Sequence, residues 1–287
     1  MSTTPGEPRA RGDTAGEVRR FLRSRRDRLT PDDVGLPHSG RRRLTGLRRE
    51  EVAHVAGISL EYYNRIERGN LAGVSETVLA ALATALRLSP SEVSYLTALA
   101  HTEAGCPARA ASSPPRRQML QILDAITSPA WIMNQAFDVL AANPMAKAVH
   151  QEMFASARRP PNPIRFVFLD PDADQVALDP AKHKARLAAF VHGASARHAT
   201  DPAFTALVQD LLANSPAFRS YWDQFDVTTN PSGTMFLRHQ LVGPLALDFE
   251  ILPFPTDPGL VLNVQTAPPD SPTWAALERL RAMLDGT

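Results

Sequence analysis

Polar side chains recur between residues 60 and 68 at a spacing that would place them together on one side of a helix. An α-helix turns by about 100° per residue, so this side lies opposite Tyr63 and Ile66, which mark the buried side. Asparagine presents donors and acceptors that match adenine, and arginine presents a fork that matches guanine, so the polar side is suited to the edges of bases. A simple solvated helix face would contain the same residue types. The polar side is formed by Glu61, Asn64, Arg65 and Arg68, with Tyr62 at its flank within reach of a phosphate.

Arginines upstream of this segment would bind the phosphates of a nucleic acid. Arg48 and Arg49 begin the preceding helical segment, where backbone N–H groups and side chains together can hold a phosphate. The run Arg41, Arg42 and Arg43 lies in a loop, and we expect it to enter a minor groove or to lie along the sugar-phosphate backbone. The alternative is a loop whose charges only keep it soluble.

Two helices joined by a tight turn would hold these side chains in position. A helix-turn-helix requires a small residue where its helices cross and a permissive residue in the turn, and residues 47–69 supply Ala53 and Gly57 at these places. Ser59 follows the turn, where it is expected to cap the second helix, 60–68, and to lie with the DNA-binding residues. Helical hairpins of other function can share this spacing.

Residues 16–101 as a whole are predicted to form an all-α domain of five helices. Apolar residues recur at helical spacing through most of this range, and Glu67 is expected to be a structural ion-pair partner. The expected order is a helix over 16–29, a helical turn near 30–33, a loop over 35–46, and helical segments over 47–99 interrupted at 57–59, 69–75 and 89–92.

The length and composition indicate a globular protein of two domains. The 287 residues, 44% hydrophobic and 21% charged, correspond to about two domains. The first 100 residues carry 16 Arg and no Lys against 12 acidic residues, a net charge of +4, whereas the remainder carries −3. A basic segment followed by a mildly acidic one is typical of a nucleic-acid module fused to another domain, although a shift of a few charges also arises by chance.

The domain boundaries follow from composition. We expect residues 1–15 to be a disordered N-terminus, 102–115 to be a linker because they are small and rich in proline, and 116–287 to be the second domain. No apolar run is long enough to cross a bilayer and the first residues lack the apolar segment of a secretion signal, so we expect a cytoplasmic, nucleoid-associated protein without a membrane partner. Cys106 is the single cysteine and lies in the linker, which excludes an internal disulfide.

The second domain lacks residue patterns for catalysis or metal binding. The segment 170–174 resembles the start of a calcium loop, but Gln175 stands where glycine is needed and Ala181 where the bidentate acid belongs. No nucleophile–base–orienter set, phosphate loop or zinc-ligand spacing is present. We therefore expect no catalytic residue, no metal and no cofactor, so that the chain is not an enzyme.

Mixed α+β structure with an antiparallel sheet is predicted for the second domain. Two short strands are expected within 130–141 around a turn at 134–135, and 164–169 is an apolar run of unassigned type. Further strands are expected in hairpin order, with turns at Gly243 and at 257–259. The expected helices are 116–126, 144–154, 182–192, 202–212 and 271–284, and the expected later strands are 234–241, 244–252 and 260–266.

Large apolar side chains occur in nearly every element of this domain and would form either an ordinary core or the wall of a ligand cavity. Two polar residues, Arg238 and His239, could meet the acid group of a ligand, although the sequence favours an ion pair at the surface or within the protein for either residue. The candidate ligand-binding residues are Trp131, Met133, Phe137, Phe166, Phe168, Leu211, Phe218, Trp222, Phe236, Arg238 and His239.

Several strings of this chain resemble known families. Residues 47–69 resemble the Cro-type (XRE) helix-turn-helix of phage repressors, and the longer string GRRRLTGLRREEVAHVAGISLEYYNRIERGN is similar to the MmyB-like regulators of actinomycetes. In the second domain, NPIRFVFLDP, LVQDLLANSPAFRSYWDQFDV and FLRHQLVGPLALDFE resemble the ligand-binding half of that family, and residues 122–150 resemble the opening of a PAS-like domain.

The resemblance implies a phage-repressor-like domain followed by a PAS-like domain that holds a small ligand mainly by apolar contacts. It also implies a link to antibiotic metabolism and an amphiphilic effector such as a fatty acid or acyl metabolite. Two departures bear on the effector's identity. Gln240 stands where the family usually has proline, and the tryptophan expected near 178–180 is absent.

These observations favour a one-component transcription regulator that binds a palindromic, double-stranded DNA operator as a homodimer and senses a small molecule. Nothing in residues 16–100 resembles a self-complementary apolar stripe, so the dimer surface is expected in the second domain. The alternatives are a DNA-tethered enzyme or acyl carrier, and a ligand-free architectural or antitoxin-like DNA binder.

Overall fold

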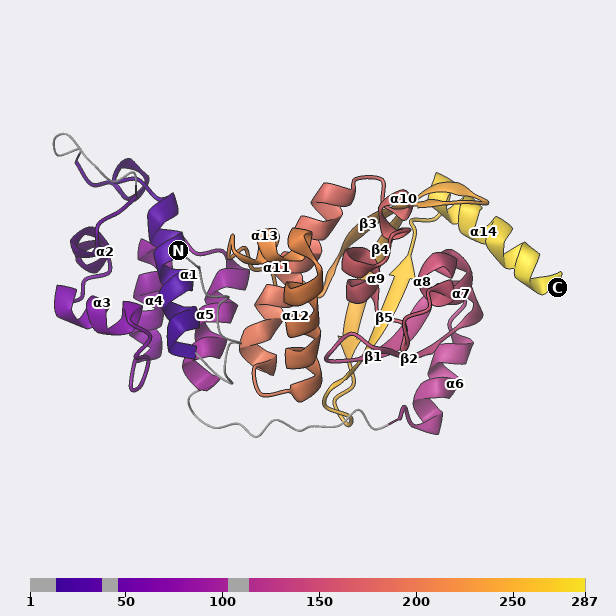
Figure 1. The fold of residues 1–287 in the computed structure, drawn as a ribbon, viewed down its shortest axis with the longest axis horizontal. Coiled ribbons are helices and arrows are strands. Elements are labelled where there is room, and N and C mark those ends of the chain that lie inside the picture. Colours follow the sequence, from indigo (N-terminus) through magenta and orange to yellow (C-terminus); the bar gives the residue numbers. More distant parts are fainter. Residues whose placement is uncertain (1–13, 38–45, 103–113, 287) are drawn as a thin grey trace, which may run out of the picture. The chain divides into compact units, whose positions relative to one another are not determined.

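The structure is a computed structural model that describes residues 14–37, 46–102 and 114–286 (Figure 1). It divides into two compact units. Unit 1 consists of Met1–Pro107, Ala189–Thr200 and Asp223–Thr229, and unit 2 consists of Ala108–Ala188, Asp201–Trp222 and Asn230–Thr287. The expected arginine run 41–43, Cys106, most of the expected linker and residues 1–13 lie outside the described residues.

Unit 1 contains five α-helices among its described N-terminal residues, as predicted. Two of these helices begin after a capping serine. Ser59 accepts a hydrogen bond from the backbone N–H of Tyr62, and Ser75 accepts one from the backbone N–H of Val78. One turn of 3₁₀ helix, Asp32–Val34, follows the first helix. The helices are α1 (Thr14–Arg28), α2 (Arg49–Val55), α3 (Leu60–Glu67), α4 (Glu76–Ala85) and α5 (Pro90–Thr102).

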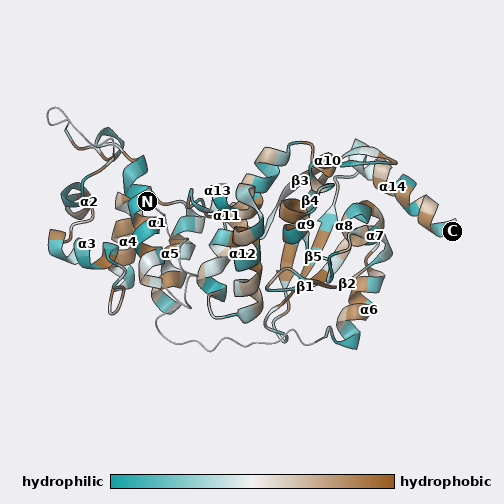
Figure 2. Ribbon diagram, viewed as in Figure 1, coloured by the Kyte–Doolittle hydropathy of each residue, from teal (hydrophilic) through white to brown (hydrophobic). Residues whose placement is uncertain are grey.

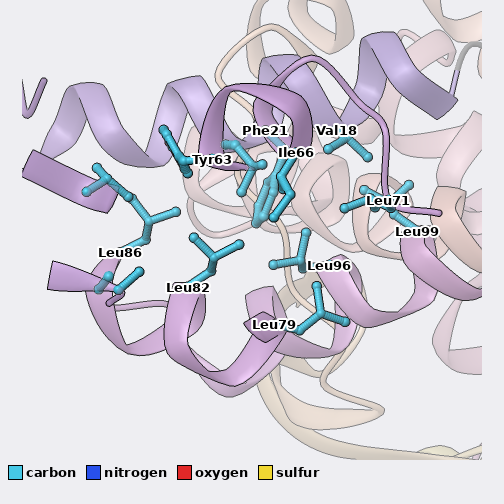
Figure 3. Close-up of a cluster of buried hydrophobic side chains, with 14 of the residues drawn as sticks. Val18, Phe21, Tyr63, Ile66, Leu71, Leu79, Leu82, Leu86, Leu96 and Leu99 are labelled. Atoms are coloured by element: carbon cyan, nitrogen blue, oxygen red, sulfur yellow. The ribbon is translucent and has the colours of Figure 1, made fainter. Parts of the chain in front are cut away.

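One hydrophobic core holds these helices together. Phe21 of α1, Tyr63 and Ile66 of α3, and Leu82 of α4 are fully buried in it. Figure 3 shows their side chains directed toward one another, together with Leu96 of α5. The face of α3 that was predicted to be buried is therefore the face that fixes this helix on the bundle.

Two segments from the C-terminal half of the sequence belong to unit 1. The first is the end of α11 (Pro180–His198), where the imidazole Nε2 of His192 lies 2.8 Å from the Glu17 carboxylate. The second is 223–229, where the Arg25 guanidinium donates to the Phe225 carbonyl. Both segments lie within the range 116–287 that was expected to form the second domain, and Ala196 and Val227 from them also pack on the apolar core of unit 1.

Unit 2 contains a five-stranded antiparallel sheet in the order β2-β1-β5-β4-β3. Hairpins join β1 to β2, β3 to β4 and β4 to β5, and the central pairing of β1 with β5 places Trp131 opposite Asn263. The strands are β1 (Ala130–Asn134), β2 (Val139–Ala142), β3 (Ser232–His239), β4 (Gly243–Pro253) and β5 (Leu260–Thr266).

Helices complete unit 2, so the predicted α-domain followed by an α+β domain is confirmed. Two apolar clusters join the sheet to helices: one with α6 around Met119 and Leu123, the other with α7 and α14 around Val149 and Leu277. Both α6 and α14 carry hydrophobic and hydrophilic residues in Figure 2, as expected of helices with one face on a core. The helices are α6 (Arg117–Ala125), α7 (Pro144–Val149), α8 (Gln151–Ala155), α9 (Pro163–Leu169), α10 (Ala173–Val176), α12 (Pro202–Asn214), α13 (Pro216–Trp222) and α14 (Pro272–Asp285).

Local sequence explains the details that periodicity left open. The apolar run 164–169 is the helix α9, because Asn162 caps the backbone N–H groups of Ile164 and Arg165 and Pro163 occupies the first turn. Gly243, expected in a turn, is the first residue of β4. Among the described helices, none combines the length and apolarity needed to cross a membrane.

Candidate functional site

The turn between α2 and α3 fixes the orientation of α3. Ala53 is buried on the inner side of α2, and Gly57 has a φ of +65°, a left-handed conformation that glycine adopts without a steric cost. Ser59 then caps α3 through the backbone N–H of Tyr62 at 3.1 Å. Each position in the expected helix-turn-helix spacing therefore has a definite backbone or packing role.

The exposed face of α3 carries the polar side chains that the sequence placed there. Glu61 and Arg65 are exposed, as is Arg68 at the end of the helix, whereas Asn64 is half-buried. Tyr62 is also half-buried, and the Arg65 guanidinium carbon lies 4.8 Å from the centre of its ring. This cation–π contact holds the guanidinium along the helix, which lowers the entropy cost of binding a partner.

Two open hollows flank α3. One has a volume of about 700 Å³ and is lined by Asn64, Arg48 and residues of α1, including Arg23. The other, of about 1070 Å³, is lined by Arg65, Arg68 and Asn70 among others. Arg23 and Asn70 were not predicted as site residues. Arg23 lies in the range 16–29, for which the sequence predicted only a helix.

Arg48 is oriented by the start of α2. Its backbone N–H donates to the Glu51 carboxylate at 2.6 Å, and its half-exposed guanidinium lies 3.3 Å from Glu50. The side chain borders the first hollow. A cation at this rim is placed to contact a phosphate.

Arg49 has a different environment from the one expected. Its Nε lies 2.7 Å from the carboxylate of Glu67, which is 2% exposed and also lies 3.3 Å from Arg26. Hydrogen bonding to Glu67 raises the pKa of Arg49. A buried carboxylate must be paired, so Arg49 serves first as the ion-pair partner of Glu67. The sequence predicted that Glu67 would form such a structural ion pair. Its guanidinium still borders the hollow beside α3.

A small cavity of about 70 Å³ lies in unit 2. Three of the predicted ligand-binding residues, Trp131, Phe166 and Phe236, line it. The sequence did not single out His150 and His183, which also line the cavity, because isolated histidines without a partner pattern carried no signal. The apolar part of the wall includes Met153, Val167, Leu187 and Met235.

The other predicted ligand-binding residues lie outside this lining. Phe218 contacts Phe168 and Trp222 with ring centres 5.0 and 5.3 Å apart, and Phe137 contacts Phe204 at 6.2 Å. Aromatic residues of this kind are buried because they pack on one another. The predicted residues that are buried outside this lining are Met133, Phe137, Phe168, Leu211, Phe218 and Trp222.

The two predicted polar residues of β3 also lie outside the lining of this cavity. Arg238 is exposed and does not line the cavity. His239 is buried, and its ring nitrogens lie within 3.0 Å of the Ala148 carbonyl and 3.2 Å of the Leu241 amide. Its hydrogen-bonding capacity is thus used to fix the end of β3.

Two histidines, His150 and His183, contribute polar groups to the wall of the cavity. The Nε2 of His150 lies 2.7 Å from Oε1 of Gln265, and its ring meets Trp131 edge-on at 5.0 Å. Burial lowers the pKa of His150 and, with smaller contributions from Arg186, His150 and Lys184, lowers that of His183 to about 4. Across 14–37, 46–102 and 114–286, no group of three or more His, Cys, Asp or Glu side chains could hold a metal ion.

Comparison with known families finds a matching model for each half of the chain. The model described as MmyB-like transcription regulator ligand binding domain matches residues 115–280, and the model described as helix-turn-helix domain matches residues 17–96. None of the curated proteins matches the chain. The first range includes 189–200 and 223–229, the two segments that unit 1 contains.

Proposed function

Since this chain belongs to the family of MmyB-like transcription regulators, and so pairs a DNA-binding helix-turn-helix with a ligand-binding domain, we propose that α3 reads the bases of a specific operator. The observation that carries this proposal is the two-sided character of α3. Tyr63 and Ile66 are fully buried, while Arg65 and Glu61 on the other side face solvent. A helix held in this way can enter a major groove without disturbing the core.

The residues around α3 divide by chemistry into two groups. Asn64 and Arg65 carry the side chains that distinguish bases, whereas Arg48 and Arg23 carry charges suited to phosphates. Arg41, Arg42 and Arg43 are proposed to add phosphate or minor-groove contacts. Arg49 is assigned to holding Glu67 and, through its exposed side, to the same phosphate-binding edge.

The operator is proposed to be palindromic and to be bound by a homodimer. One helix-turn-helix contacts a few base pairs, so regulators of this kind usually bind two half-sites about 10 base pairs apart or a multiple of that. We propose that unit 2 provides the closed two-fold contact.

Unit 2 is proposed to bind an acyl-like amphiphile whose presence changes operator affinity, with target genes in secondary metabolism. The apolar wall of the cavity supports the first part of this proposal, and the family resemblance supports the second. At about 30 Å³ per water molecule, a cavity of about 70 Å³ accepts a small head group. The acyl chain would require the cavity to widen.

The operator proposal is tested by selecting bound sequences from random duplex DNA and then measuring Asn64→Ala and Arg65→Ala. Each should weaken specific binding by roughly 1–3 kcal/mol and relax preference at one operator position. Arg117→Ala, which removes one exposed charge from α6, is the charge-matched control and should bind normally. Unaltered specific binding by both folded α3 variants would reject α3 as the recognition helix.

Ligand sensing is tested by native mass spectrometry of the purified full-length chain. A retained small molecule that shifts operator affinity on addition supports a sensor. Conversion of that molecule would support an enzyme, and no bound molecule under any growth condition would support a ligand-free DNA binder.

A further inference from the structure

The cavity of unit 2 is lined by apolar and uncharged polar side chains. None of its lining residues is Asp, Glu, Lys or Arg. The polar members are the indole of Trp131 and the imidazoles of His150 and His183. These three groups set what kind of head group the cavity can accept.

Hydrogen-bonding capacity beside this cavity is left unused within the described structure. The indole N–H of Trp131 is buried without a partner, and so are the amide oxygen of Asn263 and the amide nitrogen of Gln265. All three residues are more than nine-tenths buried. Trp131 and Asn263 are directly opposed on β1 and β5, and Gln265 is bonded to His150.

Unused buried polar groups of this kind are rare in proteins and need a cause. Leaving such a group without a hydrogen bond destabilises the folded protein, and the large majority of buried polar groups are bonded to protein or to ordered water. Three such atoms on two neighbouring strands, around a histidine that lines a cavity, indicate that a polar group from a ligand completes the set.

The protonation of the histidines determines whether that group can carry a charge. An amide oxygen can only accept, so Nε2 of His150 donates to Gln265. Burial lowers the pKa of His150 and so favours the neutral ring, in which Nδ1 is an acceptor. Burial keeps the pKa of His183 near 4, so this imidazole is also neutral at pH 7.

Nearby cations are engaged elsewhere. Arg186 donates to the Thr234 carbonyl at 2.7 Å and stacks on Phe249 at 5.3 Å, while Lys184 lies 2.5 Å from the Asp174 carboxylate. A carboxylate entering the cavity would therefore lose its hydration without gaining an opposite charge, which is costly.

We infer that the cavity binds an uncharged carbonyl head group, best a primary amide, on an apolar carbon chain, and discriminates against the free acid. The inference rests on the proposed ligand-binding role of unit 2 and specifies its chemistry. Trp131 supplies a donor for the carbonyl oxygen, Asn263 supplies an acceptor for the N–H group, and the apolar wall takes the first carbons of the chain.

The test compares three probes of equal chain length on the full-length protein at pH 7.5: hexanamide, hexanoate and hexylamine. Isothermal titration calorimetry should show binding of hexanamide at least 10-fold tighter than that of either charged probe. Equal or tighter binding of hexanoate would overturn the inference, and so would the absence of hexanamide binding at 10 mM.

Two variants assign the effect to this cavity. Trp131→Phe keeps an aromatic ring and removes the indole N–H, so hexanamide affinity should fall at least 5-fold. The matched Trp274→Phe on α14, where the indole is partly exposed, should leave the affinity unchanged. His183→Arg places a permanent cation at the cavity and should reverse the preference toward hexanoate. Unchanged probe preference in a folded His183→Arg protein would contradict the assignment, whatever the fate of Trp131→Phe.

Failure of this inference is separable from failure of the proposed function. A protein that binds its operator specifically but prefers hexanoate leaves the regulator intact and rejects only the neutral head group. A protein without specific DNA binding rejects the operator role of α3 whatever the probes show.

Discussion

Replacing Glu17 by glutamine should destabilise unit 1 strongly, and the loss should depend on pH. The Glu17 carboxylate receives hydrogen bonds from Tyr95 at 2.9 Å and Arg20 at 2.9 Å, and lies 2.8 Å from Nε2 of His192. Burial by itself raises the pKa of Glu17. The hydrogen bond and the electrostatic attraction from His192 act in the opposite direction, as do the hydrogen bonds from Arg20 and Tyr95. Together they outweigh burial and lower the pKa of Glu17 from 4.5 to about 2.

The magnitude follows from this pKa. At about 1.4 kcal/mol per pKa unit, a change from 4.5 to about 2 stabilises the folded state by about 3 kcal/mol when the carboxylate is ionised. The side chain is 18% exposed, so solvent screening removes little of this. Because the folded pKa lies below the unfolded one, the contribution is complete above pH 4.5 and is lost as the pH falls through 2.

Urea denaturation of the full-length protein, followed by far-ultraviolet circular dichroism, measures the effect. Glu17→Gln should reduce the free energy of unfolding by about 2–3 kcal/mol at pH 7, and the difference from the wild type should shrink toward zero near pH 2. The control is Glu76→Gln, since Glu76 is 75% exposed and exposed substitutions usually change stability by less than about 0.5 kcal/mol. A loss below about 1 kcal/mol at pH 7, or a loss independent of pH, would refute this reasoning.

Three further outcomes are expected. Arg48→Ala should weaken binding to all DNA sequences alike and reduce the slope of log affinity against log salt by about one, and an unchanged slope in filter-binding titrations would remove Arg48 from the phosphate contacts. Gly69→Ala should lower the free energy of unfolding by more than about 2 kcal/mol in urea denaturation, because φ is +96° and a Cβ would lie 2.3 Å from the Ala15 backbone. Gly57→Ala has free space around it and should lower the free energy of unfolding by only about 1–2 kcal/mol through left-handed strain. Equal losses in the two variants would contradict this difference. The free energy of unfolding of unit 2 should fall by up to about 3 kcal/mol between pH 6.5 and pH 4, because the unfolded His183 imidazole takes up a proton that the folded one, with its pKa of about 4, does not. Urea denaturation of His183→Gln over the same pH range should show a flatter dependence. Identical profiles of the variant and the wild type would exclude His183 as the cause.

The helix-turn-helix and its face could be predicted because their signals are local. Ser59 caps α3, Gly57 permits the turn, and Tyr63 and Ile66 repeat at helical spacing, so neighbouring residues alone determine these features. The strands of unit 2 were predicted for the same reason. The DNA-binding roles of Asn64, Arg65 and the arginines remain predictions.

The ligand cavity could be predicted only in part, because its wall is assembled from distant segments. The cavity is lined by the aromatic residues Trp131, Phe166 and Phe236. Phe168 and Phe218 are also large aromatic residues, but they pack on each other instead. Side-chain type cannot distinguish these two outcomes. His183 acquires its significance only from the burial around it.

The inclusion of 189–200 and 223–229 in unit 1 means that this unit is encoded in three separate stretches of sequence. A chimera joined within 103–113 would leave Glu17 and Arg25 facing whatever residues another protein supplies in place of His192 and Phe225. Such recombination would have to preserve these pairings, so the two halves are expected to be inherited together. Exchange of effector specificity between regulators of this kind should proceed by substitution around the cavity, without transplantation of the whole domain.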